Sequence, residues 1–299
     1  MITTLSAALE MRPVVLDGGL ATQLEAQGHN LDSALWSARL LHDDPDAIVQ
    51  AHLAYFAAGA QVASTASYQA SIDGFVRAGM THAEAEKLIK RSVRLAEQAR
   101  ANHRDDHGRW IAGSVGPYGA ALADGSEYRG DYSLSMDQLR KWHRPRIQLL
   151  AEAGVDILAL ETIPCLVEVE ALLAEIDGSG QQCWLSITCA GDRTRAGEPA
   201  EEAFAFARDV NEIIAVGVNC IDPADASALI SIASRAASKP VVIYPNSGER
   251  WDATTKTWVG PATFQAEGVQ DWITGGARLV GGCCRVGPTE IKAIRNLVA

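Results

Sequence analysis

The stretch ARLVGGCCR, residues 277–285, contains a short apolar run, a Gly-Gly pair and two adjacent cysteines. An apolar run of this length that ends at glycines is typical of a buried β-strand. Seven earlier runs of the same kind precede it along the chain. The eight strands that the sequence predicts cover residues 14–17, 61–65, 110–114, 156–161, 183–188, 213–219, 240–244 and 277–281.

Segments of helical length separate these strands. The segment 46–58 has the clearest end signals, because Asp44 can cap it, Pro45 suits its first turn and Gly59 suits its exit. The remaining predicted helices cover residues 83–101, 137–152, 166–176, 200–211 and 224–236. Pro145 lies inside one of them and predicts either a kink or the start of a new helix.

The alternation of strands and helices indicates the fold class. Strands that are apolar along nearly their whole length are typical of a parallel sheet covered by helices. Eight such units favour a (β/α)8 TIM barrel, and 299 residues are an ordinary length for this fold as a single domain. The alternative is an open doubly wound sheet, but no GxGxxG motif follows the first strand. We therefore expect one α/β barrel domain over residues 1–299.

Composition excludes several classes of function. A formal net charge of −11 without a basic run argues against a nucleic-acid partner. No stretch approaches the roughly 18 consecutive apolar residues of a membrane helix, and residues 1–13 lack the apolar core of a signal peptide. We therefore expect a cytoplasmic protein with no membrane partner. Six cysteines in such a chain favour metal binding or thiol chemistry over a disulfide framework.

Three of the cysteines directly follow predicted strands: Cys220, Cys283 and Cys284. The Gly-Gly pair before the last two gives the backbone conformations that are closed to other residues, so that neighbouring sulfurs can converge on one ion. Three thiolates around zinc leave one position open, as in catalytic sites. No CxxC pair is present, which disfavours a zinc ribbon. Two other interpretations stay open: free cysteines as small core residues, and a vicinal disulfide.

Polar residues follow several of the other strands. Because the carboxyl ends of barrel strands form one mouth, we expect these side chains to converge there with the cysteines. They are Asp17, Thr65, Ser67, Glu161, Thr162 and Asn219. A buried acid is costly when unpaired, so Asp17 and Glu161 favour a site over packing, although either could bond to a nearby loop. Arg285 either recognises a carboxylate or pairs with a neighbouring acid.

The loops expected at the same mouth are long and aromatic. The loop 18–43 carries Trp36, and a loop of this length is usually functional or disordered. Two further loops, 116–136 and 246–261, supply the aromatic residues Tyr118, Tyr128, Trp251 and Trp258. Such rings suit a cationic or apolar substrate, although any single tryptophan can instead anchor its loop.

Four motifs, in this order and spacing, resemble those of the zinc-dependent homocysteine S-methyltransferases over essentially the whole chain. They are DGG at 17–19, ET at 161–162, GVNC at 217–220 and GGCCR at 281–285. Three others look most like the S-methylmethionine-dependent members: SYQA at 67–70, GPYG at 116–119 and YPNSGE at 244–249. The betaine-using relatives carry a C-terminal extension that supports tetramers, whereas this chain stops at Ala299 and has no folate or cobalamin module. The donor should therefore be a small molecule bound in the same barrel.

The resemblance implies a reaction and a set of site residues. Cys220, Cys283 and Cys284 would hold zinc, and the thiolate of homocysteine would take the open position and accept a methyl group, giving methionine. Asp17 and Glu161 would anchor the homocysteine ammonium, and Trp36 and Tyr68 would face the sulfonium donor. The other expected substrate contacts are Thr65, Ser67 and Asn219. The implied donor is S-methylmethionine, with S-adenosylmethionine as a second candidate, and the implied assembly is a monomer or small homo-oligomer.

Several alternatives to this function remain. Within the family, the chain could be a betaine-homocysteine or a selenocysteine methyltransferase. Outside it, Cys283 and Cys284 could form the reversible disulfide of a vicinal-dithiol redox enzyme, or the cysteines could belong to a noncatalytic zinc scaffold. Neither outside alternative explains Asp17 and Glu161.

Overall fold

The computed structural model describes residues 3–31, 35–103, 108–252 and 257–298. Its centre is one parallel sheet in the order β1-β12-β9-β8-β5-β4-β3-β2. A parallel bridge between Leu16 and Val62 joins β1 to β2 and closes the barrel. The strands are β1 (Val14–Val15), β2 (Val62–Ser64), β3 (Trp110–Val115), β4 (Ile157–Ile163), β5 (Cys183–Ile187), β8 (Ile213–Asn219), β9 (Val241–Tyr244) and β12 (Ala277–Val280). The predicted (β/α)8 barrel is confirmed, with strand ends shifted by only one or two residues.

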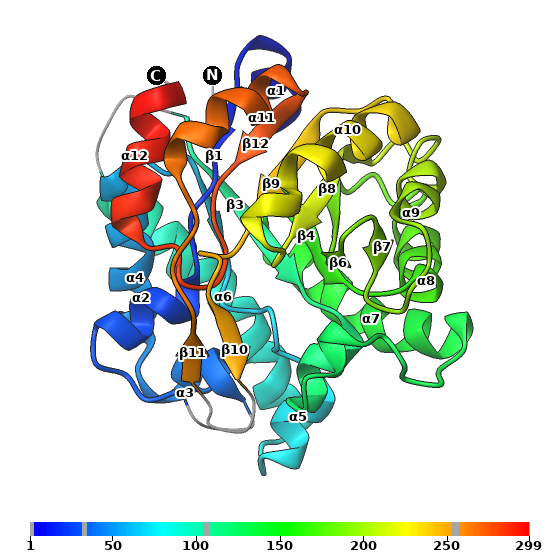
Figure 1. Ribbon diagram of the computed structural model, residues 1–299. Coiled ribbons are helices and arrows are strands. Elements are labelled where there is room, and N and C mark those ends of the chain that lie inside the picture. Colours follow the sequence, from blue (N-terminus) through cyan, green and yellow to red (C-terminus); the bar gives the residue numbers. More distant parts are fainter. Residues whose placement is uncertain (1–2, 32–34, 104–107, 253–256, 299) are drawn as a thin grey trace.

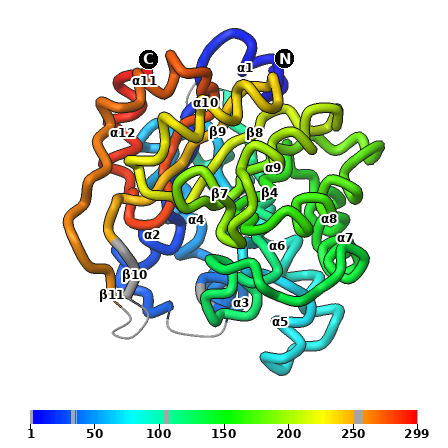
Figure 2. The backbone as a smooth tube through the Cα atoms, turned by 45° about the vertical axis from the view of Figure 1, so that its right-hand side comes forward, coloured from blue at the N-terminus to red at the C-terminus, as the bar shows by residue number. Residues whose placement is uncertain are grey.

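Helices surround the strands, as Figures 1 and 2 show from two sides. Those that follow the barrel strands include α4 (Pro45–Ala58), α6 (His82–Asn102), α7 (Met136–Glu152), α8 (Leu166–Ile176), α9 (Ala200–Phe206), α10 (Ala226–Ala237), α11 (Val269–Thr274) and α12 (Pro288–Val298). Shorter helices are α1 (Leu5–Met11), α2 (Leu20–Ala26), α3 (Leu40–Asp43) and α5 (Ile72–Arg77). Two short hairpins pair β6 (Cys189–Ala190) with β7 (Arg193–Thr194) and β10 (Arg250–Asp252) with β11 (Thr257–Val259). In the described residues, no helix has both the length and the apolar character needed to cross a bilayer.

The local signals for α4 act as predicted. The Asp44 side chain accepts a hydrogen bond from the Ala47 amide at 3.2 Å, Pro45 opens the helix, and Gly59 ends it with a φ of 102°. Of the two alternatives for Pro145, the start of a new helix is wrong, because α7 continues through that residue. The predicted helix 200–211 is too long: α9 ends at Phe206, where the chain tightens into bonds that span three residues.

The barrel interior follows the two-residue period of its strands. In β3, Trp110 and Ala112 point into the same interior cluster, and in β4 Ile157 and Ala159 do so. Trp184, Ala215, Val242 and Leu279 come from four further strands of the barrel. Helix α1 contributes Leu5, Ala8 and Leu9 to this cluster, and the Trp110 indole donates to the Thr3 carbonyl at 3.0 Å. The N-terminal segment therefore seals one end of the barrel, and the polar residues gather at the other.

Candidate active site

Three thiols meet at the open end of the barrel. Cys220 directly follows β8, and Cys283 and Cys284 lie in the turn after β12. Their Sγ atoms all lie within 4.8 Å of one another, and those of Cys220 and Cys283 are 2.6 Å apart. All three are free thiols, and Cys220 is buried. The predicted convergence of these cysteines is confirmed.

The Gly-Gly pair is needed for close packing. The sequence predicts that these glycines supply unusual backbone angles, and this explanation is wrong, because neither has a positive φ. A Cβ atom on Gly281 would lie 2.6 Å from the Leu16 Cβ, and one on Gly282 would lie 2.0 Å from the Val286 Cγ1. The left-handed residue in this turn is Arg285, with a φ of 65°. Glycines here let the cysteine turn pack directly against the end of β1.

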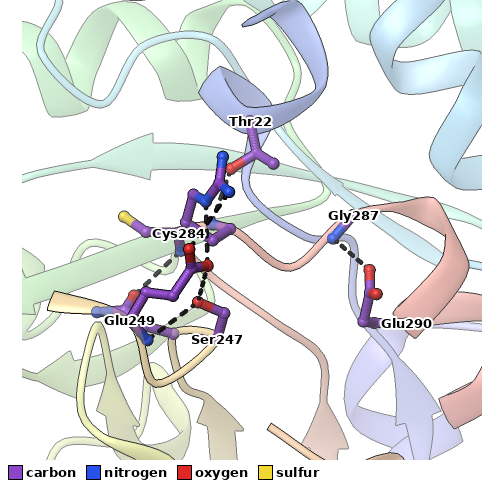
Figure 3. Close-up of polar contacts among 8 residues, drawn as sticks. Thr22, Ser247, Glu249, Cys284, Gly287 and Glu290 are labelled. Atoms are coloured by element: carbon purple, nitrogen blue, oxygen red, sulfur yellow. Dashed lines mark hydrogen bonds and ion pairs between the residues drawn. The ribbon is translucent and has the colours of Figure 1, made fainter. Parts of the chain in front are cut away.

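Polar contacts hold the cysteine turn in place (Figure 3). The Arg285 guanidinium pairs with Glu249 at 3.1 and 3.3 Å, so its predicted pairing with a neighbouring acid is the one that the structure shows. The Arg285 amide donates to the Thr22 hydroxyl at 2.8 Å. Ser247 donates through its hydroxyl to Glu249 at 2.9 Å and through its amide to the Cys284 carbonyl at 3.0 Å. The loop after β9 and helix α2 thus fix the turn from two sides.

The charges of the cluster call for a cation. Hydrogen bonds to Cys220 and Cys284, followed by burial, raise the pKa of Cys283 well above its ordinary value. Hydrogen bonds from Cys220 and Cys283 lower the pKa of Cys284. The protein alone therefore favours one thiolate, and a divalent cation is needed to hold three. A set of three thiolates suits zinc and leaves a coordination position open, so these residues fit that metal.

Asp17 lies just past β1 and is buried. Its Oδ2 accepts the Ser64 amide at 2.7 Å, and its Oδ1 accepts the Ser64 hydroxyl at 3.1 Å. Burial, with a contribution from the nearby charge of Glu161, raises the pKa of Asp17 to about 8, although the hydrogen bonds from Ser64 oppose the rise. The Asp17 carbonyl also accepts the Gly282 amide at 3.1 Å. This carboxyl group is therefore oriented by β2 and tied to the cysteine turn.

Glu161 occupies the next inward position of β4 after Ala159 and is also buried. Its carboxylate accepts hydrogen bonds from the Ser114 hydroxyl and, at 3.0 Å, from the Tyr244 hydroxyl. Burial raises the pKa of Glu161 to about 7, and the charge of Cys220 adds to the rise. Two acids with raised pKa values thus lie close to each other and to the cluster. A positively charged group of a ligand would stabilise both as carboxylates.

Asn219 is engaged at both ends of its amide. Its Oδ1 accepts the Thr162 amide at 2.7 Å and the Ser186 hydroxyl at 2.8 Å, and its Nδ2 donates to the Thr162 hydroxyl at 2.7 Å. Thr162 has a φ of 61°, a left-handed conformation that is strained for a β-branched residue. Cys220, which follows Asn219, has a φ of 51°. The Asn219 side chain therefore holds the strained strand end that carries Glu161, and Cys220 is the next residue along the chain.

Thr65 and Ser67 lie behind Glu161. Their hydroxyl groups are 2.7 Å apart, and Thr65 accepts the Ser114 amide at 3.0 Å. Ser67 donates to the Ser114 carbonyl at 2.7 Å. Both side chains thus support Ser114, which in turn donates to Glu161.

The aromatic residues differ in how they relate to the cluster. Tyr68 and Tyr128 are half-buried, and burial, followed by the charge of Cys220, raises the pKa of each. Tyr118 packs edge-on against Trp142 instead. Trp36 begins a short 3-10 helix, Trp36–Arg39, but its side chain lies outside the described part of the chain, as does that of Trp251.

Sequence reasoning missed several residues of the site. Ser114 and Tyr244 bind Glu161, and Ser186 binds Asn219. The signal for them was the strand period: Ser114 is the next inward residue after Ala112, and Ser186 follows Trp184 in the same way. Glu127, in the loop after β3, gave no such signal.

Comparison with known proteins gives consistent similarities. A family model described as homocysteine S-methyltransferase matches residues 14–298, which include the whole barrel and the three cysteines. A homocysteine S-methyltransferase of Bacillus subtilis is 44% identical to the chain, over 94% of the chain and 93% of the relative. A selenocysteine Se-methyltransferase of Brassica oleracea is 40% identical, over 94% and 88% respectively. The metallated crystal structure of the homocysteine methyltransferase MmuM from Escherichia coli superposes with a TM-score of 0.87 at 39% identity, covering 96% of this chain and 97% of that one.

Proposed function

The chain belongs to the homocysteine S-methyltransferase family, and from this premise we propose that it transfers a methyl group from S-methylmethionine to homocysteine. The product is methionine. The observation that carries this proposal is the cluster of three thiols beside two buried acids at the open end of the barrel. Neither a redox dithiol nor a noncatalytic metal site requires those acids.

Cys220, Cys283 and Cys284 would hold the zinc ion of this family. Zinc lowers the pKa of a thiol that it binds, and so supplies homocysteine as a thiolate nucleophile at neutral pH. The protein's part is to keep the three ligands in one place. The packed glycines, the Glu249–Arg285 pair and Asn219 do so.

Asp17 and Glu161 are proposed to bind the homocysteine ammonium. Ser64 fixes one carboxylate, and Ser114 and Tyr244 fix the other, so both are oriented before the substrate arrives. An ammonium between them would draw the protons from two acids whose pKa values burial has raised. Thr65, Ser67 and Asn219 contribute through these supports. This preorganisation would hold the homocysteine sulfur in line with the methyl group of the donor.

The transfer balances without a further reactant. The electron pair of the homocysteine sulfur forms a bond to the methyl carbon while the bond from that carbon to the donor sulfonium breaks. That pair stays on the donor sulfur, so S-methylmethionine and homocysteine each become methionine. The thiol proton leaves to solvent when homocysteine binds. The aromatic faces of Tyr68 and, in this proposal, Trp36 would stabilise the sulfonium charge before transfer.

The donor is proposed from size and charge. S-methylmethionine combines a sulfonium with a short amino-acid chain, whereas S-adenosylmethionine also needs room for an adenosine. Betaine carries its methyl groups on nitrogen and lacks an ammonium. Selenocysteine is a second candidate acceptor, because a relative with 40% identity carries that activity in its name.

Further aspects of the proposal concern location and assembly. All six cysteines are free thiols, which is typical of a reducing compartment, and we place the enzyme in the cytoplasm. We take the chain as one catalytic barrel that works as a monomer or small homo-oligomer.

The test is a steady-state assay of methionine formation with zinc-loaded enzyme and saturating homocysteine. Efficiency should be highest with S-methylmethionine, lower with S-adenosylmethionine and lowest with betaine. Replacing homocysteine by selenocysteine tests the second acceptor. A higher efficiency with betaine than with both sulfonium donors would contradict the proposed donor. Formation of no methionine with any donor would contradict the proposed function.

A further inference from the structure

Glu127 carries a polar atom that the protein leaves unsatisfied. Its Oε2 is buried, and the described residues offer it no hydrogen-bond partner. Arg129, a cation two residues away, pairs instead with Asp131 at 3.3 Å. A buried acceptor of this kind is costly unless a ligand or water completes it. An oxygen held in this state within a functional loop therefore points to a ligand group that donates a hydrogen bond.

The loop that carries Glu127 is fixed by its own backbone. Glu127 lies in the 3-10 helix Ser126–Tyr128, in the loop after β3, at the open end of the barrel. The Tyr128 amide donates to the Gly125 carbonyl at 3.1 Å, and the Gly130 amide donates to that of Ser126 at 2.9 Å. At Gly119 a Cβ atom would lie 2.5 Å from the Glu127 amide nitrogen, so the loop is packed from behind as well. The backbone that carries the carboxylate is thus fixed.

The carboxylate lies at the same end of the barrel as the thiols and within electrostatic reach of them. Burial, with a smaller contribution from the charge of Cys220, raises the pKa of Glu127 to about 7. The pKa of Tyr68 is raised by burial first, then by the charge of Cys220 and then by that of Glu127. Glu127, Cys220 and Tyr68 therefore lie within electrostatic reach of one another. A ligand that places a methyl group at the thiols could place another group at Glu127.

The chemistry of the free oxygen selects among the ligand groups. A sulfonium has no N–H or O–H to donate, so it cannot complete the Glu127 oxygen. An ammonium has three donors, and each needs an acceptor. Asp17 and Glu161 already accept hydrogen bonds from Ser64, Ser114 and Tyr244, and they are assigned to homocysteine. The remaining ammonium in the reaction is that of the donor, a few bonds from its sulfonium.

We propose that Glu127 binds the α-ammonium of the methyl donor and thereby selects sulfonium donors that are amino acids. The proposal rests on the function proposed above and names the residue that recognises its donor. It also accounts for the low rank expected for betaine, which offers no N–H group to this carboxylate.

The experiment compares two donors on two enzymes. One donor is S-methylmethionine, and the other is its analogue without the amino group, a dimethylsulfonio carboxylate of the same chain length. With S-methylmethionine, Glu127→Gln should raise the donor KM about tenfold or more and leave the homocysteine KM and the zinc content unchanged. With the analogue, wild type and variant should perform alike. Glu127→Asp keeps the charge, so its KM for S-methylmethionine should lie between those of wild type and Glu127→Gln. Asp124→Asn, in the same loop, should leave the ratio of efficiencies with the two donors unchanged.

Four outcomes would overturn the proposal. Equal losses with both donors would assign Glu127 to the sulfonium or to the loop structure. A rise in the homocysteine KM would assign it to the acceptor. If wild type makes methionine from S-methylmethionine and Glu127→Gln does so equally well, only this inference fails. If wild type makes none, the donor proposal fails and the role of Glu127 fails with it.

Discussion

The two ends of the barrel interior are built by the same strands and filled in opposite ways. At the sealed end, inward positions hold large apolar side chains such as Trp110, Ile157 and Trp184. Two or four residues further along the same strands, the inward positions hold Ser114, Glu161 and Ser186. The sealed end is completed by α1, whereas the open end is completed by loops. Packing at the sealed end stabilises the fold. This stability offsets the cost of burying polar groups at the open end.

This difference explains where the strained residues lie. Thr162, Cys220 and Arg285 all have positive φ values. All three lie at or just past the open ends of barrel strands. Such conformations persist only when the surroundings determine them. Here the Asn219 side chain holds Thr162, and the Thr188 hydroxyl donates to the Cys220 carbonyl. Glu249 and Thr22 hold Arg285. Packing at the sealed end offsets the free energy that these strained conformations cost. Substitutions should therefore affect stability at one end and function at the other.

The largest effect should come from the cysteines at the open end. Cys220→Ala, Cys283→Ala or Cys284→Ala should abolish methyl transfer and lower zinc content, because all three ligands are needed to leave one position open. Metal analysis together with the methionine assay measures both. Cys183→Ala is the matched control, since Cys183 is buried in β5 away from the cluster. This variant should keep both its zinc content and its activity. Near-normal activity with substoichiometric zinc would contradict the assignment for that cysteine.

The sealed end should respond in stability. Trp184→Ala should lower the free energy of unfolding by about 3–5 kcal/mol, as expected for removing a fully buried aromatic side chain. Urea unfolding followed by circular dichroism measures it. Trp184→Phe should cost less, because it keeps most of the packing and removes the indole N–H that donates to Tyr244 at 3.1 Å. If Trp184→Ala left stability unchanged, the role given to this end would be wrong.

Substitutions of Asp17 and Glu161 should lower activity rather than stability. Asp17→Asn and Glu161→Gln should keep zinc and lose roughly tenfold or more in kcat/KM for homocysteine, because each removes a charge-assisted bond. For wild type, this parameter should fall as the pH drops below the range of about 7 to 8 set by the pKa values of Glu161 and Asp17. Unchanged kinetics in both variants would mean that these acids are structural.

The same raised pKa values fix the sign of the stability effect. The folded state holds protons on Asp17 and Glu161 that the unfolded chain releases near pH 4, so stability should fall as pH rises from about 4 to 8. Either neutral variant should flatten this decline and gain stability over wild type at pH 8. Denaturant titrations at pH 5 and pH 8 without substrate compare the two. A steeper decline in the variants would contradict the reasoning.

The smallest effect should come from the Glu249–Arg285 pair beside the cysteine turn. Glu249→Gln removes the pair with Arg285, which is partly exposed, so the free energy of unfolding should change by less than about 1 kcal/mol. Because the pair steadies the turn of Cys284, zinc should nevertheless leave to a chelator faster, by up to about tenfold. Glu290→Gln is the control, since Glu290 accepts from Gly287 on the far side of the turn (Figure 3). Equal rates of zinc loss in both variants would contradict a role for the pair.

The barrel could be predicted because its information is local. Apolar runs such as 213–219 mark buried strands regardless of what surrounds them, and that strand has the predicted ends. The end of α9 could not be found, because no glycine or proline marks it. The Arg208 side chain there donates to the Ala236 carbonyl at 2.8 Å, a contact that depends on the neighbouring helix.

The site divides in the same way. Cys220, Asp17 and Glu161 stand out because reactive or charged residues at strand ends are unexpected in a core. Asn219 was expected at the substrate, and its Oδ1 accepts from Thr162 and Ser186, contacts that the sequence could not show. Glu127 lies in a polar loop, where an acidic residue is common and does not indicate a site. Only the burial of its free oxygen distinguishes it.

The hydrogen bonds from Trp184 to Tyr244 and from Tyr244 to Glu161 give the protein a built-in optical probe. An indole emits at a wavelength and intensity that depend on the charge and hydrogen bonding around it. Proton loss at Glu161, two hydrogen bonds away, would alter the field at the Trp184 ring. A fluorescence difference between wild type and Trp184→Phe, followed while homocysteine is added, would therefore report the ionisation of Glu161 during binding, with no label and no turnover.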